Sequence, residues 1–284
     1  MIRDPASFQI LLDTIARFVR EKLIPREPEV TETDEIPADI MAEMRRMGLF
    51  GLTIPEAYGG LGLTTEEEAL SSMALCEASP VFRSIMGTNN GIGGMGIVID
   101  GTEAQKKKYL TRLSRGEILG AFCLTEPGAG SDVQGIITTA RREGDHYVVN
   151  GSKMFISRVE HSDLMVLLAR TTPYDELEDK TRGLSCFLLD LRTAKGLDVR
   201  PLKLMFNHHS TALFFDNVEI PAENLIGQEG QGFRYIIDSW NAERILVASE
   251  ALGDGYWFID KASSYASTRE VFGRPIGANQ GVQF

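Results

Sequence analysis

The pattern of hydrophobic and polar residues divides the chain into a helical part, a part rich in short β-strands and a second helical part. Near the N-terminus, apolar residues recur every three or four positions, the spacing of one face of an α-helix, at Phe8, Leu11, Leu12, Ile15, Phe18, Val19 and Leu23. We expect Pro25 to end this helix, because proline disrupts a helix interior. Further helices are predicted around residues 40–47, 70–76 and 102–113. A capping box precedes the helix at 70–76, either Thr64 with Glu67 or Thr65 with Glu68.

Near residue 118 the period changes, and short runs of strand-forming residues appear at 119–125, 147–149, 164–168, 185–191 and 212–215. The pair Asn150-Gly151 predicts a hairpin turn, because both residues tolerate a positive φ. The polar and acidic segment 173–180 is expected to be an exposed loop. After Gly232 the helical period returns and continues to the end of the chain, with a break near residues 273–275.

Separate helical and strand-rich blocks of this kind are typical of an α+β multidomain protein. We expect an N-terminal α-helical domain at 1–118, a middle β domain at 119–229 and the start of a C-terminal α-helical domain at 230–284. The last block is short and carries an apolar face that would be exposed by itself. We therefore expect that this chain contains an incomplete, C-terminally truncated final domain.

Composition restricts the possible partners. The chain has 284 residues, of which 43% are hydrophobic and 24% charged, values that are typical of a soluble globular protein. The net charge of −11 argues against nucleic-acid binding. No uncharged apolar run has membrane-spanning length, and the N-terminus has no apolar secretory segment. Three cysteines without metal-type spacing fit a reducing compartment. These features predict a cytoplasmic protein with no membrane partner.

Two motifs are interpreted as structural. The run Gly91-Ile92-Gly93-Gly94-Met95-Gly96 fits G-x-G-x-x-G, but no convincing strand precedes it and no acidic ribose partner follows. Close packing of helices or a loop is the favoured interpretation. His208-His209 is an adjacent pair whose members face different ways, and no third ligand is near in sequence. We interpret the pair as a loop and expect no metal site.

Two other segments carry candidate chemistry. The glycine-rich stretch from Thr125 to Val133 follows a predicted strand, so its bare backbone N–H groups could approach an anion or a planar ring. A plain hairpin loop is the alternative. Phe155 and Ser157 lie two positions apart and face the same side of a strand, which suits stacking on a ring and hydrogen bonding to its edge. A core phenylalanine beside a surface serine is the alternative.

The predicted helix after Gly232 places Trp240, Glu243, Arg244 and Val247 on one face. A glutamate and an arginine on an otherwise apolar stripe are costly to bury without a purpose. Glu243 could therefore be a general base whose pKa is tuned by burial, beside an anion-binding arginine. A salt bridge to the absent part of the last domain is the alternative.

Together these segments resemble the acyl-CoA dehydrogenase family over nearly the whole chain. The motifs that carry the resemblance are IPEAYGG at 54–60, GTEAQK at 101–106, LTEPGAGSD at 124–132, NGSKMFIS at 150–157, FDNVEIP at 215–221, GQGF at 230–233, Glu243-Arg244 and REVFGRPIG at 269–277. The resemblance implies a helical domain, a β-barrel-like domain and a helical bundle, with FAD bound between the last two.

The resemblance also implies site residues. Those expected to contact FAD are Phe122, Leu124, Thr125, Gly130, Ser131, Phe155, Ser157, Arg269, Phe272 and Gln280. Many relatives have Trp and Thr where this chain has Phe155 and Ser157, so an aromatic face and a hydroxyl are both kept. Arg269, Phe272 and Gln280 match positions that reach the FAD of a neighbouring subunit, which implies a homo-oligomer, either a dimer or a tetramer. The expected substrate-binding residues are Ser131, Asn241 and Arg244.

The implied reaction is the α,β-dehydrogenation of an acyl-CoA thioester, with electron-transfer flavoprotein as the electron acceptor. Most branches of the family place the catalytic base in the last helical domain, but the isovaleryl and long-chain branches place it just before the arginine of the earlier helix. This chain has Glu243 at that position, so Glu243 is the expected base. The alternatives are an oxygen-using acyl-CoA oxidase or flavin monooxygenase of the same fold, and a non-catalytic acyl-CoA-binding protein.

Overall fold

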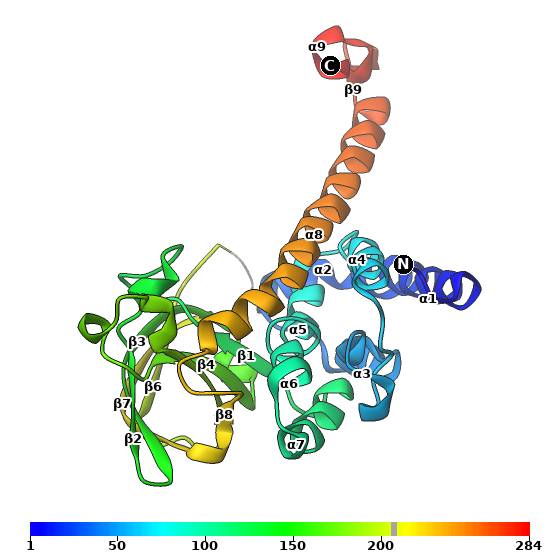
Figure 1. Ribbon diagram of the computed structural model, residues 1–284. Helices are drawn as coiled ribbons and strands as arrows, with labels where there is room; N and C mark the ends of the chain where they lie inside the picture. Colours follow the sequence, from blue (N-terminus) through cyan, green and yellow to red (C-terminus); the bar gives the residue numbers. More distant parts are fainter. Residues whose placement is uncertain (206–208) are drawn as a thin grey trace.

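The structure is a computed structural model that describes residues 1–205 and 209–284. Its N-terminal part consists of helices and its middle part of one β-sheet, and a long helix then extends from the sheet across the N-terminal helices (Figure 1). The predicted fold class, with helical, β and helical parts in this order, is confirmed. The N-terminal helices are α1 (Pro5–Phe18), α2 (Glu27–Thr33), α3 (Ala38–Arg46), α4 (Thr65–Leu75), α5 (Pro80–Asn90), α6 (Gly94–Asp100) and α7 (Glu103–Ser114).

The N-terminal helices enclose their own core, which includes Ile15, Phe18, Leu23, Met44, Phe50 and Phe82. The prediction that Pro25 ends the first helix is wrong. After α1 the chain forms a π-helical turn at Val19–Leu23 and a 3-10 turn at Ile24–Arg26, and then enters α2. Pro25 lies in the first turn of the 3-10 segment, where an absent N–H costs little. Helical structure therefore continues through the proline in a distorted form.

The capping box is present in the Thr64–Glu67 form. The Glu67 N–H donates to Thr64 Oγ1 over 3.3 Å, and the Thr64 N–H donates to Glu67 Oε2 over 2.8 Å. The G-x-G-x-x-G run lies at the junction of α5 and α6, where a Cβ on Gly94 would lie 1.9 Å from the Asn89 carbonyl oxygen. Close packing of helices, the favoured interpretation of this motif, is thus what the structure has.

The middle part is a mixed sheet in the strand order β6-β7-β3-β2-β4-β5-β8, with β1 paired in parallel to β4. Alternate residues of β4 belong to two hydrophobic cores, so both faces of this strand are covered. The strands are β1 (Gly120–Cys123), β2 (Thr139–Glu143), β3 (His146–Ser157), β4 (Leu164–Arg170), β5 (Leu184–Asp190), β6 (Leu197–Pro201), β7 (Ser210–Pro221) and β8 (Leu225–Ile226).

The hairpin turn predicted at Asn150-Gly151 is wrong, because β3 continues through both residues. The register between β3 and β7 shifts between Val149 and Gly151, so the pair forms a β-bulge. The Asn150 carboxamide oxygen accepts a hydrogen bond from the Asn217 N–H over 2.9 Å. Pairing with a strand distant in sequence has overridden the local turn signal, and the turn lies between β2 and β3 instead.

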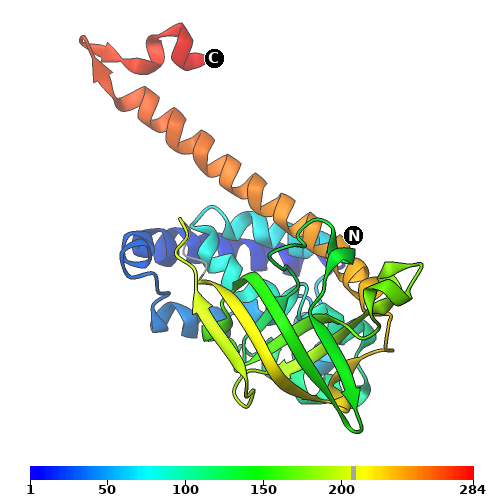
Figure 2. The same cartoon turned by 90° about the vertical axis from the view of Figure 1, so that its left-hand side faces the viewer.

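The last part is dominated by helix α8 (Gly232–Thr268), which begins against β5, packs on α4 and then projects beyond the rest of the chain (Figures 1 and 2). At its far end the chain forms a two-stranded hairpin, β9 (Glu270–Val271) with β10 (Arg274–Pro275), and the short helix α9 (Gln280–Gln283). The predicted break near residues 273–275 thus coincides with a hairpin.

Two glycines of α8 should respond oppositely to replacement by alanine. A Cβ on Gly253 would lie 2.5 Å from the Met73 carbonyl oxygen of α4, so Gly253→Ala should lower the free energy of unfolding by about 1–3 kcal/mol. Among the described residues no atom lies within 4 Å of a Cβ on Gly255, so Gly255→Ala should raise it by up to about 1 kcal/mol. Denaturant unfolding of both variants measures the sign of each change in the free energy of unfolding. If Gly255→Ala were destabilising and Gly253→Ala were not, the described packing of α8 on α4 would be contradicted.

Candidate active site

A cavity of about 360 Å³ lies where α5, the end of β1, β3 and α8 meet. This volume is within the range of small-molecule sites. It brings together residues that are more than 100 positions apart in sequence. Its lining residues are Arg83, Ser84, Gly87, Thr88, Ile92, Phe122, Leu124, Thr125, Phe155, Ile156, Ser157, Trp240 and Glu243.

One wall of the cavity is the start of the glycine-rich segment after β1. This segment does not join β1 and β2 as a hairpin, because β1 pairs with β4 whereas β2 pairs with β3 and β4. It does contain a tight turn, in which Glu126 and Ala129 form an antiparallel bridge. It is fixed by Glu126, whose carboxylate accepts the N–H groups of Ile137 and Thr138 over 2.8 and 3.0 Å. Thr125 is consequently held at the edge of the cavity.

Glu126 also forms a buried ion pair with Lys153 of β3, at a distance of 3.0 Å from Nζ to Oε1. Lys153 is 1% exposed and donates a second hydrogen bond to the Leu124 carbonyl oxygen over 2.7 Å. Burial lowers the pKa of Lys153, and the neighbouring Glu126 opposes this shift. The sequence interpretation missed the pair, although a lysine and a glutamate at the edges of apolar runs are a signal for one. The pair locks β3 to the glycine-rich segment.

A second wall is formed by Phe155 and Ser157 at the end of β3. The side chain of Phe155 is 57% exposed and its φ is +58°, at a second register shift between β3 and β7. The alternative of a core phenylalanine is therefore wrong. The bulge turns the ring of Phe155 out of the sheet and into the cavity, beside the Ser157 hydroxyl.

Glu243 of α8 lies on the opposite side of the cavity and is largely buried. Its Oε1 accepts a hydrogen bond from Arg83 Nη1 of α5 over 3.5 Å, whereas its Oε2 is buried without a hydrogen-bond partner among the described residues. A Cβ on Gly91 would lie 2.4 Å from this Oε2, so glycine is needed there to leave room for the carboxylate. Burial raises the pKa of Glu243, and Arg83 partly opposes the rise. The ion-pair partner is thus in the N-terminal part of the chain.

Three charged residues around Glu243 were missed by the sequence interpretation: the buried Arg83 and Glu68 of α4, and the partly buried Glu250 of α8. Glu68 and Arg83 are 3% and 6% exposed. Burial raises the pKa of Glu68 to about 8, an effect that Arg83 partly opposes. An arginine among the apolar residues of α5 was the available signal.

Other expected site residues lie elsewhere. Gly130 and Ser131 are exposed, as are Asn241 and Arg244, and none of the four is among the described residues that line the cavity. Arg244 donates to the Asn241 carboxamide over 2.9 Å and lies over the ring of Trp240. Arg269, Phe272 and Gln280 follow the end of α8 at Thr268, and Phe272 is fully exposed. These residues remain predictions for parts of a ligand that extend from the cavity, or for a second subunit.

Comparison with known proteins agrees with this arrangement. The family models described as the acyl-CoA dehydrogenase N-terminal, middle and C-terminal domains match residues 6–117, 121–218 and 230–284. The chain belongs to the acyl-CoA dehydrogenase family. Members of this family are flavoprotein oxidoreductases, so the chain is an oxidoreductase whose family implies a flavin cofactor.

Relatives in the acyl-CoA dehydrogenase family resemble the chain throughout its length. An acyl-CoA dehydrogenase of Bacillus subtilis is 36% identical over 280 residues, which are 97% of this chain and 73% of that protein. A glutaryl-CoA dehydrogenase of Desulfococcus multivorans is 34% identical over 276 residues, which are 95% of this chain and 69% of that protein. The crystal structure of an acyl-CoA dehydrogenase from Geobacillus kaustophilus has a TM-score of 0.91 at 31% identity, covering 100% of this chain and 75% of that one.

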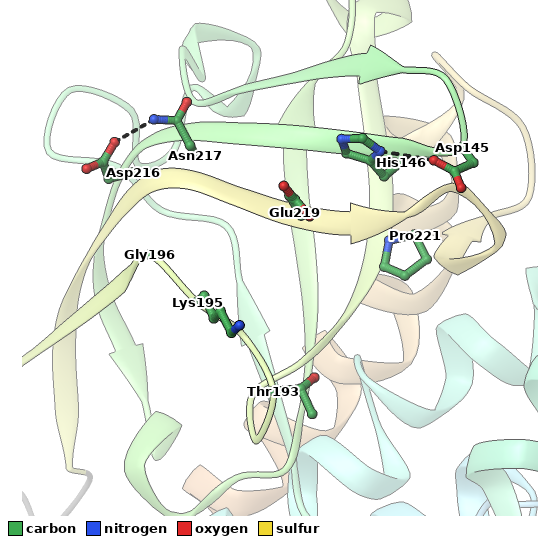
Figure 3. A pocket seen from close by; sticks show the side chains of 9 residues that line it. All are labelled: Asp145, His146, Thr193, Lys195, Gly196, Asp216, Asn217, Glu219 and Pro221. Carbon is green, nitrogen blue, oxygen red and sulfur yellow. Dashed lines mark hydrogen bonds and ion pairs between the residues drawn. The ribbon is translucent and has the colours of Figure 1, made fainter.

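A larger hollow, of about 740 Å³, lies on the middle domain of this acyl-CoA dehydrogenase family member, outside the candidate site (Figure 3). Its lining includes Asp145, Asp216 and Glu219, and the figure shows Asp145 bonded to His146. These three carboxylates outnumber the one lysine among the described lining residues, Lys195, so the hollow would repel the phosphates of an acyl-CoA. The smaller cavity beside Glu243 is therefore the better candidate for the site of the family's chemistry.

The histidine pair has an unexpected neighbour. His208 lies outside the described residues, but ligand atoms of His209, His161 and Glu35 all lie within 4.8 Å of one another. His209 Nε2 is already 2.6 Å from the Asp34 carbonyl oxygen, and the charge of buried Arg158 is near Asp34 and Glu35. A hydrogen-bonded nitrogen and a nearby cation both disfavour a metal ion. That the pair is not a metal site stays a prediction.

One further expectation concerned membranes. Within residues 1–205 and 209–284, no helix combines the length and the apolar character that crossing a bilayer requires.

The buried carboxyl of Glu68 should make stability depend on pH. Its pKa is about 8 in the folded chain against an ordinary value of 4.5, so the folded state binds the proton more tightly. The resulting stabilisation is complete below about pH 4.5 and is lost as the pH rises towards 8. Relative to wild type, Glu68→Gln should therefore gain about 2 kcal/mol or more between pH 5 and pH 8.5.

Thermal midpoints of wild type and Glu68→Gln at several pH values test this expectation. The control is Glu66→Gln, which changes an exposed carboxylate of the same helix and should follow the wild-type curve. A Glu68→Gln curve parallel to wild type across this range would mean that Glu68 is ionised in the folded chain.

Proposed function

We propose that the protein catalyses the FAD-dependent α,β-dehydrogenation of an acyl-CoA thioester, with Glu243 as the base that removes the α proton. The observation that carries this proposal is the carboxylate itself. Glu243 is largely buried, one of its oxygens has no partner among the described residues, and it faces a cavity whose other wall is an exposed aromatic ring. A carboxylate that is kept in a dry site with a raised pKa is suited to proton abstraction next to a carbonyl.

The residues opposite Glu243 fit a flavin. The open ring face of Phe155 can stack on a planar ring system, and the hydroxyls of Thr125 and Ser157 can bond to its edge. Phe122 and Leu124 complete an apolar floor. When bound, FAD supplies the acceptor for the hydride that leaves the β carbon. Glu243, which lines the same cavity, would take the α proton on its carboxylate.

We assign the more exposed residues to the outer parts of the ligands. Ser131, Asn241 and Arg244 would bind the CoA portion of the substrate, and the Arg244 guanidinium provides a cation for its phosphates in an otherwise acidic chain. Arg269, Phe272 and Gln280, carried away from the rest of the chain by α8, would contact the FAD of a neighbouring subunit (Figure 1). Electron-transfer flavoprotein is the proposed acceptor of the electrons.

Glu243→Gln should bind acyl-CoA but fail to use it. The amide is close in size to the carboxyl and cannot accept the proton, so anaerobic bleaching of the flavin by a panel of acyl-CoAs should slow roughly 100-fold or more. Stopped-flow absorbance measures the rate, and the control is Asp238→Asn, an exposed carboxylate of the same helix. Bleaching of Glu243→Gln at the wild-type rate would place the base elsewhere.

The same experiment separates the alternatives. A wild-type protein that binds acyl-CoA without any bleaching would be a non-catalytic binding protein. A reduced flavin that reacts rapidly with oxygen and slowly with electron-transfer flavoprotein would indicate an oxidase or a monooxygenase.

Phe155→Ala should weaken flavin binding without unfolding the sheet. The ring is exposed in the cavity, so its loss removes stacking area and leaves no buried void, and the apparent Kd for FAD should rise about tenfold. Quenching of FAD fluorescence measures the affinity. Phe214→Ala, at an exposed aromatic residue of β7 outside the cavity, is the matched control and should bind FAD as wild type does.

A further inference from the structure

A cluster of buried charges lies directly behind the candidate base. Arg83 Nη1 of α5 is 3.5 Å from Glu243 Oε1 and 3.3 Å from Glu250 Oε2. Glu243 and Glu250 are seven residues apart on α8, two helical turns, so they present their carboxylates to the same guanidinium. Glu68 of α4 lies on another side of the cluster, close enough for its charge to interact with those of Arg83 and Glu243.

The cluster contains more carboxyl groups than cations. Glu68 carries its proton at neutral pH, because burial raises its pKa to about 8. One guanidinium then remains for the two carboxyls of Glu243 and Glu250. Burial raises the pKa of Glu250. The charge of Arg83 opposes this rise, and the charges of Asp254 and Glu243 add to it. Two carboxylates that share one cation titrate as a coupled pair.

We propose that Glu250 is a positioning residue that shares Arg83 with Glu243 and keeps this guanidinium paired when Glu243 takes up the substrate's α proton. The inference rests on the proposed role of Glu243 as the base. It adds a function for a carboxylate that does not line the cavity and that touches neither substrate nor flavin in the proposed reaction.

The proton transfer itself shows why a second carboxylate is useful. The bond between the α carbon and its hydrogen breaks, an O–H bond forms on the Glu243 carboxylate, and the electron pair stays on the substrate. Glu243 is then neutral and no longer offsets the charge of Arg83. A buried guanidinium without a counter-ion is strongly unfavourable, but the Glu250 carboxylate at 3.3 Å remains to pair with it. The charge of the cluster is thus balanced after the step.

Glu250 also acts before the step. Its negative charge raises the proton affinity of the neighbouring Glu243 and attracts part of the Arg83 charge, so Glu243 is a stronger base than it would be in an exclusive ion pair. The other titratable groups that face Glu250 are Asp254, one turn further along α8, and Cys76 at the end of α4, whose buried thiol has a raised pKa and is neutral. Neither provides a second cation.

The test is the pH dependence of anaerobic flavin bleaching in the FAD-loaded protein. Glu250→Gln removes the shared negative charge, so Arg83 pairs with Glu243 alone. The acid limb of the profile should then move down by about one pH unit, and the plateau rate should fall about tenfold. With an α-deuterated acyl-CoA the isotope effect should increase, because proton transfer has become harder. A purely structural defect would lower the rate without moving the limb.

Two companion variants sharpen the result. Glu68→Gln removes no charge at neutral pH, since Glu68 is already protonated, and should leave the acid limb in place. Glu250→Asp retains the negative charge but moves it away from Arg83. The acid limb of the pH profile should therefore move down, as in Glu250→Gln, but by a smaller amount. Rates are normalised to bound flavin. If Glu250→Gln does not fold, Glu250→Asp decides the question. An acid limb at the wild-type pH in this variant overturns the proposal.

The outcomes separate this inference from the function on which it rests. If Glu243→Gln bleaches at the wild-type rate, the proposed base is wrong and the inference fails with it. If Glu243→Gln is inactive but Glu250→Gln keeps the wild-type limb and rate, the base stands and the role of Glu250 is overturned. A shifted limb with a larger isotope effect supports both.

Discussion

The site depends on one constraint, which is that a single helix must approach both the sheet and the N-terminal helices at backbone distance. Helix α8 begins at Gly232, where a Cβ would lie 2.6 Å from the Ser185 carbonyl carbon of β5, and meets α4 at Gly253. Between these two contacts lies Glu243. Because both ends of this span are fixed by close backbone approach, the carboxylate is placed opposite Phe155 of β3 and next to Arg83 of α5. The cavity lies where these three elements meet the end of β1.

A second set of contacts fixes the opposite wall. The buried pair of Lys153 and Glu126 joins β3 to the segment after β1. Asn89 of α5 joins β1 itself to the helices, because its carboxamide oxygen accepts the Gly120 N–H over 2.8 Å. Breaking either pair would leave a buried polar group unpaired, which costs more than the pair contributes when intact. These polar contacts therefore specify the geometry of the wall more than they stabilise the fold.

Local patterns in the sequence predicted the order of the helical and β parts, a capping box at Thr64 or Thr65, and some of the residues that border the cavity, namely Thr125, Phe155, Ser157, Trp240 and Glu243. They failed where contacts distant in sequence decided the outcome. Asn150-Gly151 carries a strong turn signal, yet pairing with Asn217 makes it a bulge. Arg83 and Glu243 are 160 positions apart, so a helical pattern could identify the glutamate but not its partner. The resemblance to a family supplied the function, and only the folded chain supplied the electrostatics.

The environment of Glu243, the proposed base, is a compromise between two ways for a buried base to fail. Without any cation, burial would raise the pKa of the carboxyl until it held its proton at neutral pH and could accept no other. In an exclusive ion pair with Arg83, the pKa would fall and the carboxylate would be too weak a base to remove an α proton. An arginine shared with Glu250, at 3.5 Å from one carboxylate and 3.3 Å from the other, lies between these limits. Three carboxyls around one guanidinium are therefore better explained by the tuning of a base than by stability, which a simple apolar core would serve better.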